Sequence, residues 1–244
     1  MSMPVAQGNP CRVVIMKAEP ETRPQPSDVT QCCTWLSEDG VPQVRCWTPG
    51  GQAIRLCGHG LLGCGTTWTK LGQVVSRIVM NDTTAQFSQQ RDISWVGFDP
   101  VACEASAVPE WVEKVFGSVP LSAAVAGGEA GYLILRWPDS MDPRDLPVPG
   151  PELAEHTLRA VIATCTDVQN PALDIRQRYF APQHGTAEDI ATGSAMRVLA
   201  SFWQAQAGHD ELRAWQCSKE GGHLFSRIDG DVTWVGGRVE ADCV

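Results

Sequence analysis

Long apolar runs are missing from this sequence of 244 residues. A helix that crosses a bilayer needs about 20 mostly apolar residues, and no stretch here approaches that length. The first ten residues, Met1–Pro10, also lack a basic segment followed by an apolar one, so we expect no signal peptide. The sequence therefore predicts a cytoplasmic protein with no membrane partner.

Basic clusters are missing too. The chain has 19 Lys and Arg against 28 Asp and Glu, which gives a formal net charge of −9. Binding to nucleic acid depends on a concentrated basic surface that neutralises phosphates. We therefore expect no nucleic-acid partner.

The cysteines lack the patterns that mark metal sites. None of the ten belongs to a Cys-x-x-Cys pair, no set of Cys and His has zinc spacing, and Cys32 and Cys33 are adjacent. Without a secretion signal, free thiols are expected rather than disulfides. We predict that most are small buried apolar side chains and that no metal is bound.

What is present is typical of a globular α+β protein. Apolar residues make up 43% of the chain, and its length suits one large domain or two small ones. Apolar spacing predicts strands over 32–36, 44–47, 75–80, 93–98, 132–137, 160–164, 178–181, 224–228 and 232–235, and helices over 61–71, 109–116, 152–158 and 193–207. The Pro-rich segments 18–28 and 138–151 are predicted loops.

Two stretches of the chain resemble each other. RCWTP (45–49) is followed by a polar connection and GHGLLG (58–63), and RYFAP (178–182) is followed by a polar connection and GSAMRV (193–198). A structural duplication explains this similarity, and it predicts two halves, residues 1–117 and 118–244. The alternative is two unrelated strand–turn–helix segments.

The turns at Gly58 and Gly193 each open a predicted helix. A helix N-terminus has unpaired backbone N–H groups and partial positive charge, and glycine lets an anion approach closely. If the two turns meet, they can hold a carboxylate and offer one proton-transfer group from each side. The sequence therefore predicts one small-molecule site that both turns share.

These motifs resemble the PhzF family, the phenazine-biosynthesis-like isomerases. RLCGHGLLG (55–63) and RYFAPQHGTAEDIATGSA (178–195) are similar to the two hallmark motifs of that family. Gly8-Asn9-Pro10 with the following RVVIM resembles its early motif, and QCSKEGGHLFSRIDGDVTWVGG (216–237) resembles its closing segment.

The resemblance implies a diaminopimelate-epimerase-like fold of two pseudo-symmetric halves. Each half is then a mostly antiparallel sheet curled around a central helix. The resemblance also implies an isomerase that moves a proton on a small carboxylate-bearing metabolite without any cofactor, and it implies a homodimer.

The match also assigns site residues. Asp189 corresponds to the second catalytic carboxylate of the family, and His59 to a site residue beside the first glycine. Substrate-binding positions by the same match are Cys57, Gly58, Gly60, Thr192, Gly193 and Ser194. The structural alternatives are a helix cap for Asp189 and an ordinary hydrogen bond for His59.

The sequence departs from the family at the other catalytic position. The acid/base glutamate normally lies in a segment like LSETAFV, and VTQCCTW (29–35) places Gln31 there. An amide cannot transfer a proton as a carboxylate does. The family's first strand is largely missing before Gly8, and the loop 18–28 replaces a helix. A catalytically impaired homologue that binds a ligand or a protein partner is therefore the alternative function.

Thiol chemistry is a third hypothesis. A cysteine opens the corresponding turn in the two-cysteine racemases of this fold, and Cys57 stands there. The second turn has Ile190-Ala191-Thr192 and no cysteine, so a buried spectator is the preferred interpretation of Cys57. Cys32 and Cys33 directly follow Gln31 and are candidate replacements for the acid, but packing is the expected role.

Overall fold

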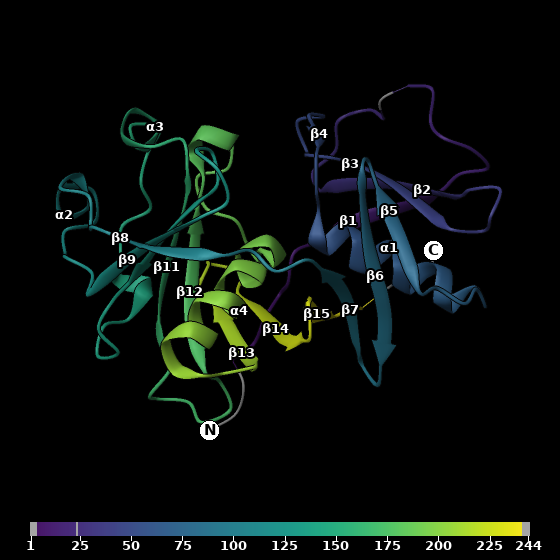
Figure 1. The fold of residues 1–244 in the computed structure, drawn as a ribbon. Coiled ribbons are helices and arrows are strands. Elements are labelled where there is room, and N and C mark those ends of the chain that lie inside the picture. The colour runs from purple at the N-terminus through teal and green to yellow at the C-terminus, as the bar shows by residue number, and fades with distance from the viewer. Residues whose placement is uncertain (1–3, 23, 241–244) are drawn as a thin grey trace. The chain divides into compact units, whose positions relative to one another are not determined.

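The chain forms two compact units in a computed structural model that describes residues 4–22 and 24–240 (Figure 1). The N-terminal unit consists of Asn9–Asp99 and the segment that begins at Val232. The C-terminal unit consists of Pro100–Asp231 and the segment that ends at Gly8. Each unit combines a mixed sheet with few helices, so the predicted α+β class is confirmed.

The boundary between the units differs from the predicted one after residue 117. Gly117 has a left-handed backbone conformation that ends helix α2 (Trp111–Phe116). Val112 and Phe116 of this helix pack with Leu133 in one core cluster of the C-terminal unit. Gly117 therefore marks the end of a helix, and packing assigns α2 to the C-terminal unit.

In the part of the chain that the structure describes, the N-terminal unit combines a mixed sheet with one helix. Its strands are β1 (Cys11–Ile15), β2 (Thr30–Leu36), β3 (Pro42–Trp47), β4 (Ala53–Ile54), β5 (Arg77–Met80), β6 (Thr83–Gln90), β7 (Ile93–Phe98) and β15 (Val232–Arg238), and its helix is α1 (Gly58–Lys70). The strand order is β1-β2-β3-β5-β6-β7-β15, with β4 beside β3. Helix α1 contacts β1, β2, β3, β5, β7 and β15, so the sheet curls around it.

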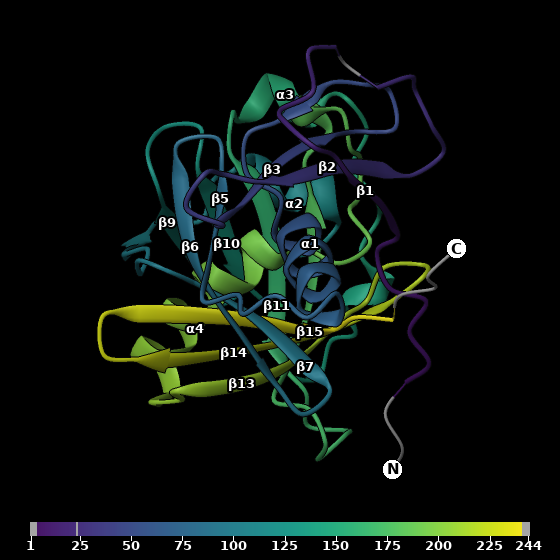
Figure 2. The same ribbon diagram turned by 90° about the vertical axis from the view of Figure 1, so that its right-hand side faces the viewer.

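The C-terminal unit has a similar sheet around a longer helix. Its strands are β8 (Cys103–Ser106), β9 (Ser122–Ala126), β10 (Tyr132–Arg136), β11 (Ala160–Thr166), β12 (Ile175–Phe180), β13 (Glu211–Gln216) and β14 (Gly222–Asp229). Its other elements are α2, α3 (Leu153–His156), α4 (Gly193–Ala207) and the 3-10 helices Pro143–Asp145 and Pro182–His184. The strand order is β8-β9-β10-β11-β12-β13-β14, and Figure 2 shows β13 and β14 side by side with α4 against them.

The two sheets repeat one pairing pattern. In the N-terminal unit, β1–β2 is parallel, β2–β3 antiparallel, β3–β5 parallel and β5–β6 antiparallel. In the C-terminal unit, the pairs β10–β11, β11–β12, β12–β13 and β13–β14 follow the same sequence of directions. The central helix in each unit connects two parallel strands, β3 to β5 and β12 to β13. The predicted pseudo-symmetric halves are confirmed.

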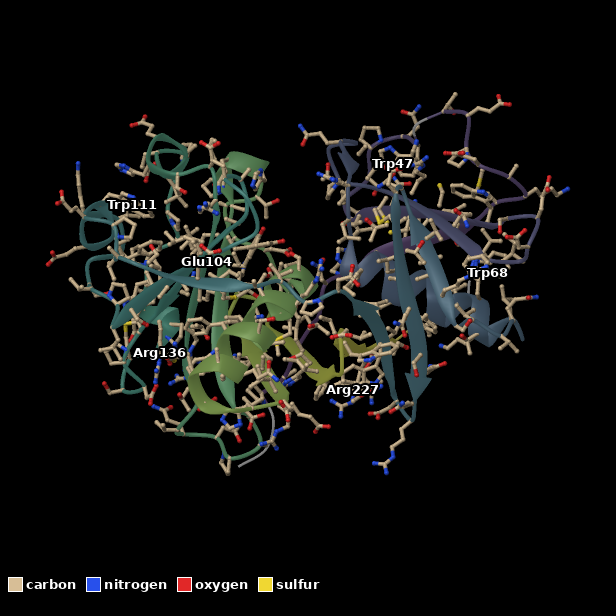
Figure 3. The ribbon with its side chains drawn as sticks, viewed as in Figure 1. Trp47, Trp68, Glu104, Trp111, Arg136 and Arg227 are labelled. Carbon is tan, nitrogen blue, oxygen red and sulfur yellow. The ribbon has the colours of Figure 1, made fainter. Side chains whose placement is uncertain are left out.

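One buried hydrogen-bond motif also occurs in both units. The indole N–H of Trp68, on α1, donates to Thr34 Oγ1 at 2.9 Å, and that hydroxyl donates to a backbone carbonyl of β3. On α4, Trp203 donates to Thr164 Oγ1 at 3.2 Å, and that hydroxyl donates to a backbone carbonyl of β12. Trp68 is labelled on α1 in Figure 3. Both tryptophans thus join the C-terminal half of a central helix to the sheet.

The sequence prediction of elements was right for the helices and incomplete for the strands. Helix α4 has the predicted bounds and ends at Gly208, whose φ is 71°. Strands β6, β8 and β9 were missed because their residues are mostly polar or small. The two-residue β4 was also missed, and so was β13, although Leu212 and Ala214 alternate with polar residues there. Within residues 4–22 and 24–240, no helix combines the length and apolar character that membrane crossing requires.

Candidate functional site

The carboxylate of Asp189 lies immediately before the N-terminus of α4. Its Oδ2 accepts a hydrogen bond from Thr192 Oγ1 at 2.6 Å, and its Oδ1 accepts one from the backbone N–H of Ile190 at 2.9 Å. Thr192 is the N-cap residue, and its side chain does not cap the helix. The two hydrogen bonds fix the orientation of the carboxylate beside a helix end that carries partial positive charge.

A buried glutamine holds this turn in place. Gln216, fully buried on β13, accepts from the Thr192 backbone N–H at 2.8 Å and donates to the Asp189 carbonyl at 2.6 Å. Its Oε1 also accepts from Gln177 Nε2 at 3.1 Å. A buried amide with all of these partners fixes the loop rigidly. Sequence reasoning missed Gln216, because nothing in ELRAWQ distinguishes it from an ordinary strand residue.

The neighbouring carboxylate has a structural role. Glu188 receives two hydrogen bonds from Arg178, at 2.6 and 2.8 Å. Arg178 also donates to the backbone carbonyls of Pro143 and Leu146. This bidentate pair occupies Glu188 and ties three segments of the C-terminal unit together. Of the two adjacent acids, Glu188 is therefore held by an arginine, whereas the Asp189 carboxylate accepts hydrogen bonds from Thr192 and Ile190 of its own turn.

Gly193 and Ser194 are the first two residues of α4. The first backbone N–H groups of a helix have no partner within the helix and form a site that suits anions. The loop that leads to them packs closely on β14, since a Cβ added at Gly222 would lie 2.5 Å from the Cβ of Ala191. Thr192, Gly193, Ser194 and Asp189 thus share one turn, as the motif predicts.

The N-terminus of α1 has different surroundings. Cys57 is its N-cap residue, and Gly58, His59 and Gly60 form its first turn. The backbone N–H of Cys57 donates to Met80 Sδ at 3.3 Å, and the Cys57 Sγ lies 3.5 Å from His59 Nδ1. The predicted residues of this turn are therefore adjacent, and a thiol and an imidazole are in contact.

The Cys57 thiol points into a group of sulfur atoms. Its Sγ lies within 4.8 Å of those of Cys32 and Cys46, and the latter two are 2.6 Å apart. We call these three side chains the sulfur cluster. Sequence patterns did not predict this cluster, because its members come from β2, β3 and the turn before α1.

Hydrogen bonds within the cluster shift the pKa values of its thiols in opposite directions. Hydrogen bonds from Cys32 and Cys46 lower the pKa of Cys57, and the adjacent His59 lowers it further. The pKa of Cys46 is raised, chiefly by its hydrogen bond to Cys32. A thiolate at Cys57 is also favoured by the N-terminus of α1. Of the nine described cysteines, which are all free, seven are buried, as predicted.

Gln31 lies on β2 and is 7% exposed. Its Nε2 donates to the carbonyl of Gln25 at 2.5 Å, so the amide fastens the Pro-rich loop to the sheet. A carboxylate at this position has no proton to donate at neutral pH and cannot make that bond. Cys33, two residues further along the strand, is also buried, and burial raises the pKa of its thiol.

The sequence is similar to phenazine biosynthesis-like proteins. The family model described as "Phenazine biosynthesis-like protein" matches residues 117–233. The mouse phenazine biosynthesis-like domain-containing protein 1 is 30% identical over 80% of this chain and 74% of its own length. The cattle relative is 51% identical over 71 residues, which is 25% of its length. An uncharacterized isomerase of Vibrio cholerae is 28% identical over 90% of this chain and 78% of its own.

Solved structures show the same fold. A PhzF family protein of Enterococcus faecalis superposes with a TM-score of 0.77 at 20% identity, over 97% of this chain and 92% of that one. A hydroxyproline epimerase of Agrobacterium vitis superposes with a TM-score of 0.53 at 12% identity, over 86% of this chain and 72% of that one. The architecture of paired α+β units is therefore shared with these proteins.

Proposed function

The chain belongs to the phenazine biosynthesis-like family, and on that basis we propose that it is an isomerase that moves a proton on a small carboxylate-bearing metabolite. The name of the Vibrio cholerae relative supports the reaction class. The proposed reaction uses no metal or organic cofactor, because the groups that it requires are a base, an acid and donors for an anion.

The observation that carries the proposal is the environment of Asp189. Its carboxylate is oriented by Thr192 and Ile190, and the loop behind it is held by Gln216. A base must be held rigidly at hydrogen-bonding distance from the carbon acid, and this network supplies such rigidity. Asp189 is our candidate for the group that removes or returns the substrate proton.

The helix N-termini and His59 complete the proposal. The backbone N–H groups at Gly193 and Ser194 suit a carboxylate, or an enolate that develops beside one. His59, in the first turn of α1, is our candidate for a second proton-transfer group, with Gly58 and Gly60 as binding positions. We propose that both turns serve one substrate, and that the protein is a homodimer in solution.

Deuterium exchange tests the reaction. The protein is incubated in deuterated buffer with a panel of small carboxylates, and loss of a carbon-bound proton is followed by NMR. We expect exchange with at least one compound, and we expect Asp189→Asn to slow it by roughly 100- to 10,000-fold, the usual size of a general acid–base contribution. Asp210→Asn, at an exposed position beyond the C-terminal end of α4, is the control and should exchange normally. Equal rates in both variants contradict the role of Asp189.

The second candidate function is a ligand-binding homologue without catalysis. It is favoured by Gln31, whose amide holds the loop and supplies no proton. Under this hypothesis the native chain binds carboxylates without exchange, and Gln31→Glu creates exchange that the native chain lacks. If the native chain exchanges protons and Asp189→Asn stops it, this hypothesis is wrong.

A racemase that relies on Cys57 is disfavoured. The Cys57 side chain is buried, and its sulfur faces Cys32 and Cys46. We expect iodoacetamide to modify Cys57 of the native protein slowly, at a rate that carboxylates do not change. Rapid alkylation that a substrate analogue blocks would restore the thiol hypothesis.

A further inference from the structure

The sulfur cluster has the composition and convergence of a metal site. We propose that Cys32, Cys46 and Cys57 together bind one thiophilic d10 cation, either Zn²⁺ or Cu⁺. Thiolates are the protein ligands that these two cations prefer. The proposal is independent of the isomerase function, because none of its measurements uses a substrate.

The three sulfurs converge on one point. A Cβ atom added at Gly60 would lie 2.6, 2.7 and 3.1 Å from the sulfurs of Cys32, Cys46 and Cys57, respectively. This point lies at nearly equal distances from the three sulfurs. No side-chain atom of residue 60 occupies it, because that residue is glycine. A metal–sulfur bond is about 2.3 Å long. The ligands are therefore within reach of one ion after small side-chain rotations.

Those rotations must separate two of the sulfurs. Tetrahedral ligands at about 2.3 Å from zinc lie roughly 3.8 Å from one another, whereas the sulfurs of Cys32 and Cys46 are 2.6 Å apart. The two residues are directly opposite each other on β2 and β3, so a change of rotamer can adjust the distance without moving the strands. Cys57 enters from a third segment and closes the triangle.

The surroundings suit a soft cation. The cluster side chains are 0%, 2% and 4% exposed, so the sulfurs are shielded from bulk solvent. Met80 brings a thioether to the Cys57 backbone, and Cys11 and Cys64 lie next to Cys32. Sulfur ligands in a dry site select Zn²⁺ and Cu⁺ over the oxygen-preferring Mg²⁺ and Ca²⁺.

Binding exchanges the three thiol protons for the metal ion. Three S–H bonds break, three metal–sulfur bonds form and three protons pass to solvent, with no change in oxidation state. With Zn²⁺ the complex carries one negative charge, which the N-terminus of α1 favours at Cys57. Because the sulfurs are buried, we expect the ion to enter during folding.

Metal content is the first test. The full chain is produced in medium supplemented with Zn²⁺ or with copper, purified with a non-thiol reductant, and analysed by inductively coupled plasma mass spectrometry. Chain unfolded in urea and refolded with each metal is analysed in the same way. We expect one equivalent of metal to remain bound to each chain after dialysis. Comparison of the zinc and copper preparations identifies the preferred cation. A metal content well below one equivalent in every preparation overturns the proposal.

Matched variants locate the ion. Cys46→Ser should lower the affinity by at least about 100-fold, since even loss of a group outside the ligand shell costs about 10- to 100-fold. Cys33→Ser is the control, because Cys33 neighbours Cys32 on β2 and alternation places it on the opposite face of the strand. Cys33→Ser should retain full binding. Equal loss in both variants, or no loss in either, overturns the assignment.

Two further measurements separate ligation from folding. X-ray absorption of the loaded protein should show three sulfur neighbours at about 2.3 Å, and a shell of oxygen or nitrogen alone contradicts the proposal. Metal should raise the Tm of the native chain and of Cys33→Ser but not that of Cys46→Ser. Asp189→Asn should bind metal normally, so failure of the isomerase proposal leaves this result unchanged.

Discussion

The two central helices begin in equivalent places but in chemically different surroundings. When RCWTP is aligned with RYFAP, Cys46 on β3 corresponds to Tyr179 on β12. Their partners on the neighbouring strands, Cys32 on β2 and Ile162 on β11, then correspond as well. The N-cap residues are Cys57 and Thr192. Around α1 these positions hold sulfur, and around α4 they hold aliphatic, phenolic and hydroxyl groups.

The same equivalence extends to the group that receives the N-cap backbone N–H. Cys57 donates to Met80 Sδ, and Thr192 donates to Gln216 Oε1. Register places Met80 opposite Val44 on β3 and Gln216 opposite Gln177 on β12, which are equivalent positions. The two units thus share this backbone geometry but differ in the side chain that accepts the N-cap N–H group. The strand-pairing pattern therefore sets the position of each turn, and the side chains that contact the turn set its chemistry.

The largest expected effect concerns the arginines of the repeat, Arg178 and Arg45. Arg178→Met should destabilise the protein by about 3–5 kcal/mol, because it leaves the mostly buried Glu188 without its partner. Arg45→Met should cost less than about 1 kcal/mol, because Arg45 pairs with Glu19 and their side chains are 38% and 55% exposed. Urea unfolding measures both. Equal costs would show that the two units use this position alike.

The next contrast concerns Gln216 and Met80, the two residues that accept the backbone N–H groups of the N-cap residues. Gln216→Met should cost about 3 kcal/mol, since the Thr192 N–H and the Asp189 carbonyl each lose a buried partner worth about 1–3 kcal/mol. It should also lower kcat more than it raises KM, because the carboxylate loses its rigid support. Met80→Gln is the counterpart, and it should leave the Asp189 turn intact. If Gln216→Met keeps the native stability and kcat, Gln216 does not position the Asp189 turn.

The third contrast lies one turn into each helix. Gly60 corresponds to Ala195, since both are the third residue of their helices. Gly60→Ala should cost about 1–2 kcal/mol, because the new methyl group would lie within 3.1 Å of all three cluster sulfurs. Ala195→Gly should cost about 0.5–1 kcal/mol through backbone entropy alone. Thermal unfolding compares them, and a harmless Gly60→Ala would show that the sulfurs can move away.

The last contrast concerns two thiols outside the sulfur cluster, Cys217 and Cys103. Burial, the main cause, raises the pKa of Cys217 from 9.0 to about 12. The unfolded chain ionises this thiol at a lower pH, so its contribution to stability is complete below pH 9 and is lost as pH rises toward 12. Cys217→Ala should therefore flatten the fall in stability above pH 9. Cys103→Ala, where the pKa is raised only to about 11, should do so less.

Much of the architecture followed from local sequence. The glycine that ends each central helix, the turn at Gly193 and the repeated Arg-x-aromatic segments predicted the elements and the duplication, because they act over a few residues. Strands with few large apolar residues, such as β6, were missed. Strand β13 was missed too, and Gln216 was missed with it. The unit boundary was misplaced because a helix-ending glycine and a unit boundary have the same local appearance.

Local sequence is enough to predict two turn–helix segments and to place Asp189 before one of them. The surroundings of each turn depend on the tertiary fold. Cys32, Cys46 and Cys57 become neighbours through strand register and a helix crossover, and Gln216 reaches Thr192 in the same way. Local propensity fixes the conformation of a segment, whereas pairing between distant strands selects which side chains share its interior.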